Sequence, residues 1–180
     1  MNLDHISNDI IAKAQKIRFL VLDVDGILTN GSLYFDDKGN EALKVFNSKD
    51  GQGIKLLQQA NIKVGIITAR NSVMVARRAT ELGIEHLIQG RKDKLVALPD
   101  LFDDAEIDYQ QIGYMGDDLA DLPVMKKIGL AMTAADGHWF IRQQSHWISQ
   151  YGGGKGAVRD ACDLILLAQG KFDALLKPFM

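Results

Sequence analysis

The chain has 180 residues, of which 47% are hydrophobic and 24% are charged, with a formal net charge of -2 at pH 7. This length and composition fit one globular domain over residues 1–180. The near-neutral charge argues against proteins that bind nucleic acid or anionic membranes through a basic surface. The first residues lack the basic start and apolar core of a signal peptide, and Cys162 is the single cysteine. We therefore expect a cytoplasmic protein without an internal disulfide.

Short apolar, β-branched segments alternate along the chain with longer helix-like segments. Strands are expected at 17–23, 62–67, 84–88, 110–115, 128–131 and 146–148, and helices near 51–60, 71–82, 93–104, 119–126 and 156–168. Strands that are apolar on both faces and separated by helices are typical of a parallel sheet covered on both sides. With right-handed crossovers, this pattern predicts a doubly wound, Rossmann-like α/β fold.

The segment after the first strand breaks this alternation. Residues 31–47 read GSLYFDDKGNEALKVFN, two short apolar runs around a turn near Gly39 and Asn40, and this predicts a β-hairpin. Both faces of the hairpin carry apolar side chains, which a projecting hairpin cannot bury by itself. We expect it to pack against another copy of the chain. The alternative is a hairpin that lies flat on its own domain.

Three of the expected strands run directly into polar residues. Asp23 and Asp25 end the first strand, Thr68 follows the second, and Asp117 and Asp118 follow the fourth. Ligands of open α/β sheets bind beyond the carboxyl ends of the strands, so these side chains should converge. Asp23 and Asp25 point to the same side of an extended chain, where they repel each other unless a cation or a shared proton intervenes.

A cluster of carboxylates at this edge suits Mg²⁺, which takes oxygen ligands and commonly keeps waters and a substrate phosphate. Thr68 offers a hydroxyl donor, and Lys94 offers a cation at the start of the next helix. Both suit a transferring phosphoryl group, whose catalysis consists mostly of positioning and charge stabilisation. A carboxylate can also act as the nucleophile and form an aspartyl phosphate.

Neither an EF-hand nor a glycosyltransferase motif accounts for the two strand-end aspartates. An EF-hand loop needs an oxygen ligand where Ile27 stands, and it follows a helix rather than a strand. A glycosyltransferase DxD needs a nucleotide-binding region, and no phosphate-binding glycine motif follows a strand here. Two surface aspartates with a purely structural role would leave Thr68 and Lys94 unexplained.

The polar motifs resemble those of the haloacid dehalogenase-like phosphatases. DVDGILTNG, GIITAR, Lys94 and GDDLADLPVM fall in the order of the four motifs of that superfamily, over residues 23–125. Over nearly the whole chain, DGILTNG, the hairpin, NSKDGQGI, KDKL, GDDLADLPVM and GGGKGAVRD resemble the 3-deoxy-D-manno-octulosonate 8-phosphate phosphatase family. The resemblance implies a Mg²⁺-dependent phosphomonoesterase that acts on this small acidic sugar phosphate in lipopolysaccharide synthesis.

The same resemblance implies roles for the aspartates. Asp23 is expected to be the nucleophile and a Mg²⁺ ligand. Asp25 is expected to protonate the leaving alkoxide and later to accept a proton from the hydrolytic water, while its backbone carbonyl binds the metal. Asp117 is expected to be the second carboxylate ligand, with Asp118 assisting directly or through water. Asp121 is expected to orient the ligands.

The phosphoryl oxygens are expected to bind Thr68 and Lys94, with further donors from backbone amides of a turn that Gly26 allows to approach closely. Arg70, two residues after Thr68, is a candidate for binding an anionic group of the substrate. A substitution of Arg70 by Ala is expected to raise KM more than it lowers kcat.

The glycine-rich stretch YGGGKGAVRD contains Lys155 and Arg159 near the start of a helix. Glycines let a backbone approach a ligand and helix starts favour anions, so these two cations are candidates for binding the carboxylate or phosphate of the substrate, in their own or a neighbouring site. The alternative is a flexible connector ahead of a final core helix. Beyond that helix, residues from about 170 to 180 form a tail.

No inserted cap domain fits between the motifs, because a hairpin with one helix fills 31–61 and ordinary crossovers fill 69–115. A capless site is covered either by a macromolecular substrate or by a neighbouring subunit, and the doubly apolar hairpin favours the subunit. The hairpins of the family that the chain resembles assemble four chains around a central barrel, so the resemblance implies a homotetramer. Three alternatives stay open: a phosphatase for sialic or other nonulosonic acid 9-phosphates, a non-catalytic oligomeric module of the same fold, and a phosphotransferase with an acceptor other than water.

Overall fold

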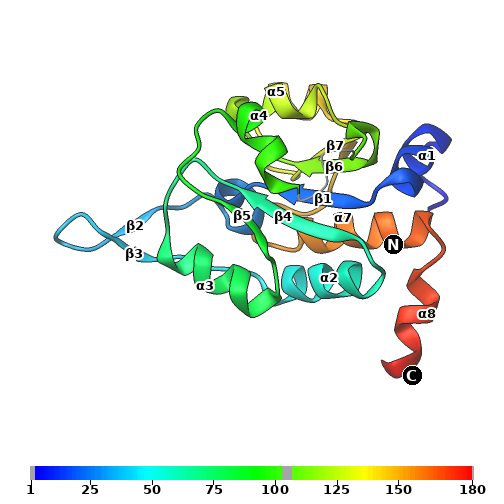
Figure 1. Ribbon diagram of the computed structural model, residues 1–180, viewed down its shortest axis with the longest axis horizontal. Coiled ribbons are helices and arrows are strands. Elements are labelled where there is room, and N and C mark those ends of the chain that lie inside the picture. Colours follow the sequence, from blue (N-terminus) through cyan, green and yellow to red (C-terminus); the bar gives the residue numbers. More distant parts are fainter. Residues whose placement is uncertain (1–2, 103–106, 180) are drawn as a thin grey trace.

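The computed structural model, which describes residues 3–102 and 107–179, contains a six-stranded parallel sheet (Figure 1). The strand order is β5-β4-β1-β6-β7-β8, and every adjacent pair is parallel. The strands are β1 (Phe19–Leu22), β4 (Lys63–Ile67), β5 (His86–Ile88), β6 (Ile112–Met115), β7 (Leu130–Thr133) and β8 (Trp147–Ile148). All six predicted strands are confirmed, and so is the doubly wound α/β fold.

Helices cover both faces of the sheet (Figure 1). One face carries α1 (Asn8–Lys16), α2 (Ser48–Gln59), α3 (Val73–Leu82) and α7 (Ala157–Ala168), and the other carries α4 (Lys94–Ala97), α5 (Leu122–Met125) and α6 (Trp139–Gln144). The helix predicted over 93–104 consists of α4 and a 3₁₀ turn at Leu98–Leu101, and its positions 103 and 104 lie outside the described residues. The prediction missed α1, α6 and α8 (Phe172–Leu176); α8 extends toward the C-terminus in Figure 1, and its Phe172 and Leu175 pack against the larger core.

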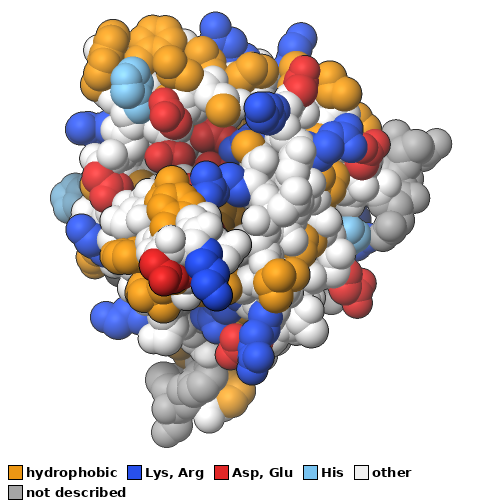
Figure 2. Space-filling model, turned by 90° about the vertical axis from the view of Figure 1, so that its left-hand side faces the viewer, with side chains coloured by type: hydrophobic (Ala, Val, Ile, Leu, Met, Phe, Trp, Pro, Cys, Tyr) orange, Lys and Arg blue, Asp and Glu red, His pale blue; other side chains and the backbone are white. Residues whose placement is uncertain are grey.

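The predicted hairpin is present as β2 (Tyr34–Phe35) and β3 (Glu41–Leu43), joined by a turn in which Asp36 accepts hydrogen bonds from two backbone amides. It projects from the end of the domain where the sheet strands finish (Figure 1). Several of its apolar residues are 41–54% exposed, namely Leu33, Tyr34, Phe35, Leu43 and Val45, whereas Phe46 packs against the larger core. Hydrophobic side chains are accordingly visible on this end of the molecule in Figure 2. The hairpin therefore does not lie flat on its own domain.

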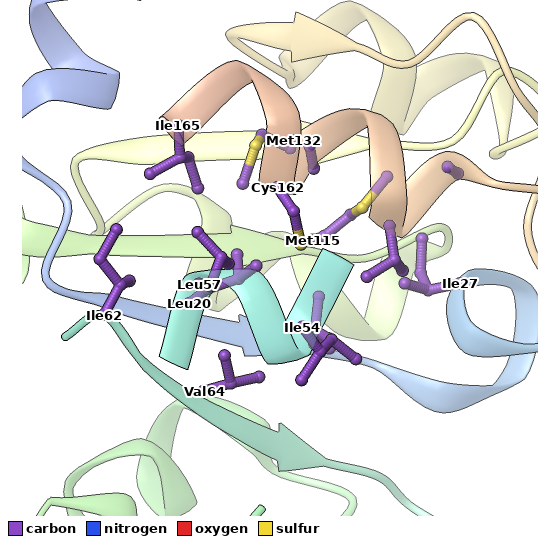
Figure 3. Packing of buried hydrophobic residues seen from close by; sticks show 14 of the residues in the cluster. Leu20, Ile27, Ile54, Leu57, Ile62, Val64, Met115, Met132, Cys162 and Ile165 are labelled. Carbon is purple, nitrogen blue, oxygen red and sulfur yellow. The ribbon is translucent and has the colours of Figure 1, made fainter. Parts of the chain in front are cut away.

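The sheet buries apolar side chains on both faces because neighbouring strand positions point to opposite sides. Leu20 and Leu22 of β1 join the larger core beneath α2 and α7 (Figure 3), whereas Phe19 and Val21 join the core beneath α4, α5 and α6. Cys162 is a free thiol buried in the larger core. Within the described residues, no helix is both long and apolar enough to cross a bilayer.

Candidate active site

The candidate site lies at the edge where three central strands end. Leu22 at the end of β1 is level with Ile66 of β4 and with Met115 of β6. The chain continues from these positions into Asp23, Thr68 and Asp117, whose strand-end positions predict that they converge. Asp23 and Thr68 are 6% and 2% exposed, so this edge buries polar groups without covering them completely.

Three carboxylates meet at this edge. Oxygens of Asp23, Asp117 and Asp121 lie within 4.8 Å of one another, the one such group of metal-ligating side chains among the described residues. Burial, followed by repulsion from Asp121, raises the pKa of Asp23 to about 7. Burial, followed by repulsion from Asp23, raises the pKa of Asp117 to about 8. Both shifts mean that the protein alone supplies too little positive charge for these carboxylates.

Lys94 supplies the cation nearest to the nucleophile candidate. Asp93 caps α4 by accepting a hydrogen bond from Val96, which places Lys94 at the first residue of the helix. The Lys94 ammonium lies 2.8 Å from Asp23 Oδ1 and 2.6 Å from Asp121 Oδ1. Burial by itself lowers the pKa of this lysine, but the two carboxylates outweigh burial and raise it. Lys94 therefore stays charged beside Asp23.

Asp121 is surrounded by donors. Its Oδ1 accepts hydrogen bonds from Lys94 at 2.6 Å and from the buried hydroxyl of Tyr114 at 2.6 Å. Its Oδ2 accepts from the backbone amides of Asp117 at 3.0 Å and Asp118 at 3.1 Å. Four donors fill the lone-pair sites of one carboxylate. This arrangement favours the orienting role expected for Asp121.

Asp118 faces solvent and its carboxylate accepts a hydrogen bond from the amide of Leu119 at 2.7 Å. Its side chain thus begins a 3₁₀ turn at Leu119–Asp121, and it lies outside the group formed by Asp23, Asp117 and Asp121. The expected assistance of Asp118 to a metal, directly or through water, stays a prediction.

Asp25 meets the hairpin rather than the other carboxylates. Lys44, just after β3, donates to Asp25 Oδ1 at 2.5 Å and also pairs with Glu41 at 3.1 Å. Arg70 Nε lies 4.0 Å from Asp25 Oδ2, and its guanidinium stacks on the ring of Phe35 at 5.9 Å. Arg70 therefore faces the site, as expected of a substrate-binding residue, and it also contacts the hairpin.

The sequence analysis missed two residues of this site. Lys44 lies within the apolar hairpin segment ALKVF. The signal in the sequence was the alternation of an extended chain, which places Lys44 on the opposite face from Leu43 and Val45. Tyr114 lies in the middle of β6, where the apolar pattern indicates a strand core and no chemical role. A hydroxyl in an otherwise aliphatic strand, shortly before the aspartates, is the signal that could have found it.

Glycines bring the site loops into contact. A Cβ at Gly26, whose φ is +90°, would lie 2.0 Å from Asp117 Oδ2, so a side chain at this position would collide with the candidate ligand. A Cβ at Gly153 would lie 1.9 Å from the carbonyl oxygen of Gly26, and the amide of Gly154 donates to Ile27 O at 2.9 Å. The glycine-rich stretch thus packs against the turn that follows Asp23.

Lys155 and Arg159, the two cations of that stretch, form no ion pair with Asp23, Asp117 or Asp121 among the described residues. Arg159 pairs with Asp163 at 2.8 Å on α7, and its backbone amide donates to Asp50 of α2 at 2.8 Å. Lys155 is exposed and, with Arg159, lines a surface cavity of about 370 Å³. The expectation that these cations bind substrate within their own site finds no contact that supports it among the described residues.

The chemistry of the donor set fits a divalent cation. Asp23 and Asp117 present oxygens to a common point, and their raised pKa values mark a place where a positive charge would stabilise both. Figure 2 shows acidic side chains grouped beside cationic and hydrophobic ones at this end of the molecule. A metal held by these carboxylates, with Lys94 and Thr68 alongside, would bind a phosphoryl group.

Comparisons with known proteins agree with this chemistry, although no protein-family model matches the chain. The 3-deoxy-D-manno-octulosonate 8-phosphate phosphatase of Escherichia coli K12 is 47% identical over 168 residues, which cover 93% of this chain and 89% of that protein. A crystal structure of the Yersinia pestis phosphatase of the same name aligns with a TM-score of 0.90 at 45% identity, covering 93% of this chain and 90% of that one.

A further solved structure carries ligands. The 3-deoxy-D-manno-octulosonate 8-phosphate phosphatase of Moraxella catarrhalis, in complex with magnesium, phosphate and 3-deoxy-D-manno-octulosonate (KDO), aligns with a TM-score of 0.92 at 43% identity. The alignment covers 98% of this chain and the whole of that one. These relatives match the present chain in fold and in length.

Proposed function

The chain belongs to the 3-deoxy-D-manno-octulosonate 8-phosphate phosphatase family, and we propose how its own residues carry out the reaction of that family. The reaction is the Mg²⁺-dependent hydrolysis of the sugar phosphate to inorganic phosphate and the free eight-carbon sugar acid. The observation that carries the proposal is the meeting of Asp23, Asp117 and Asp121 at the strand ends, with Lys94 2.8 Å from Asp23.

In the first step an oxygen of Asp23 attacks phosphorus, the bond from phosphorus to the sugar oxygen breaks, and Asp25 gives its proton to that oxygen. In the second step Asp25 takes a proton from water, the water oxygen attacks phosphorus, and the aspartyl phosphate is cleaved. Lys94 and Thr68 bind phosphoryl oxygens, and the 2.8 Å contact between Lys94 and Asp23 supports the role of Lys94.

Asp23 and Asp117 are the carboxylates that would hold Mg²⁺, and Asp121 keeps the loop that carries Asp117 in place through its bonds to two backbone amides. A bound Mg²⁺ neutralises the carboxylates and draws electron density from the phosphoryl group. Arg70 faces the same site from the end of β4 and is proposed to bind the sugar carboxylate.

We further propose that the protein is a cytoplasmic homotetramer. The exposed apolar side chains on both faces of the hairpin support assembly, because a second copy can cover what one chain leaves in water. The hairpin also lies beside Asp25 and Arg70, so a chain packed there would help to cover the open site. A single buried, free cysteine is consistent with a reducing compartment.

The test is phosphate release from 3-deoxy-D-manno-octulosonate 8-phosphate with Mg²⁺, beside sialic acid 9-phosphate and hexose phosphates. Asp23→Asn should lower the rate by about 10³-fold or more, because the nucleophile is lost. Asp9→Asn, on α1 and away from the strand ends, should leave the rate unchanged.

Octulosonate phosphate should be hydrolysed at least about tenfold faster than the other substrates, a difference of about 1.4 kcal/mol in transition-state binding. Preferential release from sialic acid 9-phosphate would instead assign the chain a nonulosonate substrate. Loss of phosphate release in every assay with wild-type protein would contradict the proposed reaction.

A further inference from the structure

Lys44 is the buried exception in an exposed hairpin. Its side chain is 2% exposed, whereas its neighbours Leu43 and Val45 are 51% and 54% exposed as residues. Alternation along the extended chain turns Lys44 toward the domain while its neighbours face outward. Lysine is almost never buried without a partner, so the contacts that it makes explain its position.

Those contacts connect the hairpin to the candidate acid and base. The Lys44 ammonium lies 2.5 Å from Asp25 Oδ1 and 3.1 Å from Glu41 Oε1. The other oxygen of Glu41 accepts a hydrogen bond from the hydroxyl of Ser72, which also caps α3. A continuous chain of polar contacts therefore runs from the start of α3 through Glu41 and Lys44 to Asp25.

Asp25 needs such a contact because it lies on an irregular turn. Its backbone is non-helical within the turn Val24–Leu28, and the next residue, Gly26, has a φ of +90°. Asp25 lies outside the cluster formed by Asp23, Asp117 and Asp121, and the nearest atom of Arg70 is 4.0 Å from its Oδ2. Among the described residues, Lys44 makes the short contact that fixes this carboxylate.

We propose that Lys44 is a positioning residue for proton transfer: it binds Oδ1 of Asp25 and leaves Oδ2 directed at the leaving group. This inference rests on the proposed function, in which Asp25 gives its proton to the sugar oxygen as the bond to phosphorus breaks. Lys44 transfers no proton itself. Because Glu41 binds both Lys44 and Ser72 of the domain, the position of the hairpin against the domain is coupled to the orientation of Asp25.

The test compares two leaving groups in the first step. A sugar alkoxide needs a proton to leave, whereas the phenolate of 2,4-dinitrophenyl phosphate does not, so only the sugar reaction depends on the acid. Release of the sugar acid and of dinitrophenolate in a single turnover, with enzyme in excess and Mg²⁺ saturating, reports this step without the later hydrolysis.

Lys44→Met should slow sugar release by about 10- to 100-fold, part of the 10²- to 10⁴-fold that a general acid contributes. Dinitrophenolate release should slow by less than about threefold, since its leaving group needs no acid. Lys44→Arg should recover most of the loss, and Glu41→Gln should give a smaller loss with the same dependence on leaving group. Lys38→Met, in the exposed turn of the same hairpin, is the matched control and should change neither rate.

An equal loss with both substrates would overturn the proposal and leave Lys44 as an anchor of the fold or a phosphate ligand. A raised KM with an unchanged first step would overturn it in favour of substrate binding. If Lys44→Met does not fold, Glu41→Gln and Lys44→Arg give the same comparison. If wild-type protein rejects octulosonate phosphate but accepts another alkyl phosphate, the proposed substrate fails, and the ratio measured with that phosphate decides on Lys44.

Discussion

The edge of the sheet where β1, β4 and β6 end and the projecting hairpin differ in which side chains they bury. At the edge, Asp23, Lys94 and Asp121 are 1–6% exposed, and their charges are paired within the chain. On the hairpin, large apolar side chains are about half exposed, and the residue that is buried is the charged Lys44. A single chain thus brings together the charged residues of the site, whereas the hairpin exposes an apolar surface suited to contact with another copy.

Removal of Lys94 tests the edge most severely. Lys94→Met leaves Asp23 and Asp121 buried without their shared cation, and loss of one partner of a buried pair costs about 3–5 kcal/mol of stability. The single-turnover rate should fall by about 10³-fold, since a phosphoryl ligand is lost as well. Urea denaturation and rapid-quench assays measure both effects. Lys92→Met, exposed two residues earlier, should change neither quantity.

A charge on the hairpin tests the second half of the comparison. Leu43→Asp should weaken assembly by about 1.5–3 kcal/mol, the contribution of burying one such side chain, while the melting temperature of the domain changes little. Light scattering across a dilution series detects the shift toward smaller species. Ile148→Asp, on the edge strand β8, is the control. A wild-type protein that is already monomeric and fully active would contradict the proposed tetramer.

Arg70 contacts both regions and has an intermediate expected effect. Arg70→Ala removes a charge that stacks on Phe35 and faces Asp25. A charge-assisted hydrogen bond contributes about 1.5–3 kcal/mol, so KM for the sugar acid phosphate should rise about tenfold or more, with a smaller change in kcat. Steady-state kinetics measure KM and kcat for Arg70→Ala, with Arg77→Ala at an exposed position on α3 as the control. An unchanged KM would exclude Arg70 from substrate binding.

The pH dependence of stability sharpens the description of the edge. The pKa of Asp23 is raised to about 7 and that of Asp117 to about 8, from an ordinary value of 3.8. A carboxyl whose pKa is raised by folding stabilises the fold fully below its unfolded pKa, and this stabilisation is lost as pH rises through the folded pKa. The contribution of these two carboxyls to the stability of metal-free protein should therefore fall between about pH 4 and pH 8 and level off above that range, and the melting temperature should fall with it.

Mg²⁺ should oppose this loss more strongly at about pH 9 than at about pH 6, because it binds the ionised carboxylates. At 100 times its Kd, a ligand adds about 2.7 kcal/mol of stability. Thermal melts with Mg²⁺ or with a chelator measure the effect. Asp117→Asn should flatten the pH dependence, whereas Asp118→Asn, at an exposed position, should keep it. Identical slopes in both variants would remove Asp117 from the explanation.

Part of this site could be predicted because it depends on strand ends. A buried strand that runs into Asp23, and another that runs into Asp117, bring their side chains to one edge in any parallel α/β sheet. The hairpin could also be predicted from the sequence, because two apolar segments flank a turn around Gly39. The six-residue α6 was missed because so short a helix depends on packing, whereas α1 was missed although Ser7 caps it and Ile10, Ile11 and Ala14 have helical spacing.

The sequence by itself determined the order of the strands along the chain, the polar residues at their ends and the apolar character of the hairpin, since all three follow from local pattern. The tertiary structure alone decided which charges pair. Lys44 meets Asp25 across 19 positions, Lys94 meets Asp121 across 27, and Gly153 packs on the turn at Gly26. Such contacts depend on how separate elements dock, and no periodicity along the chain encodes that geometry.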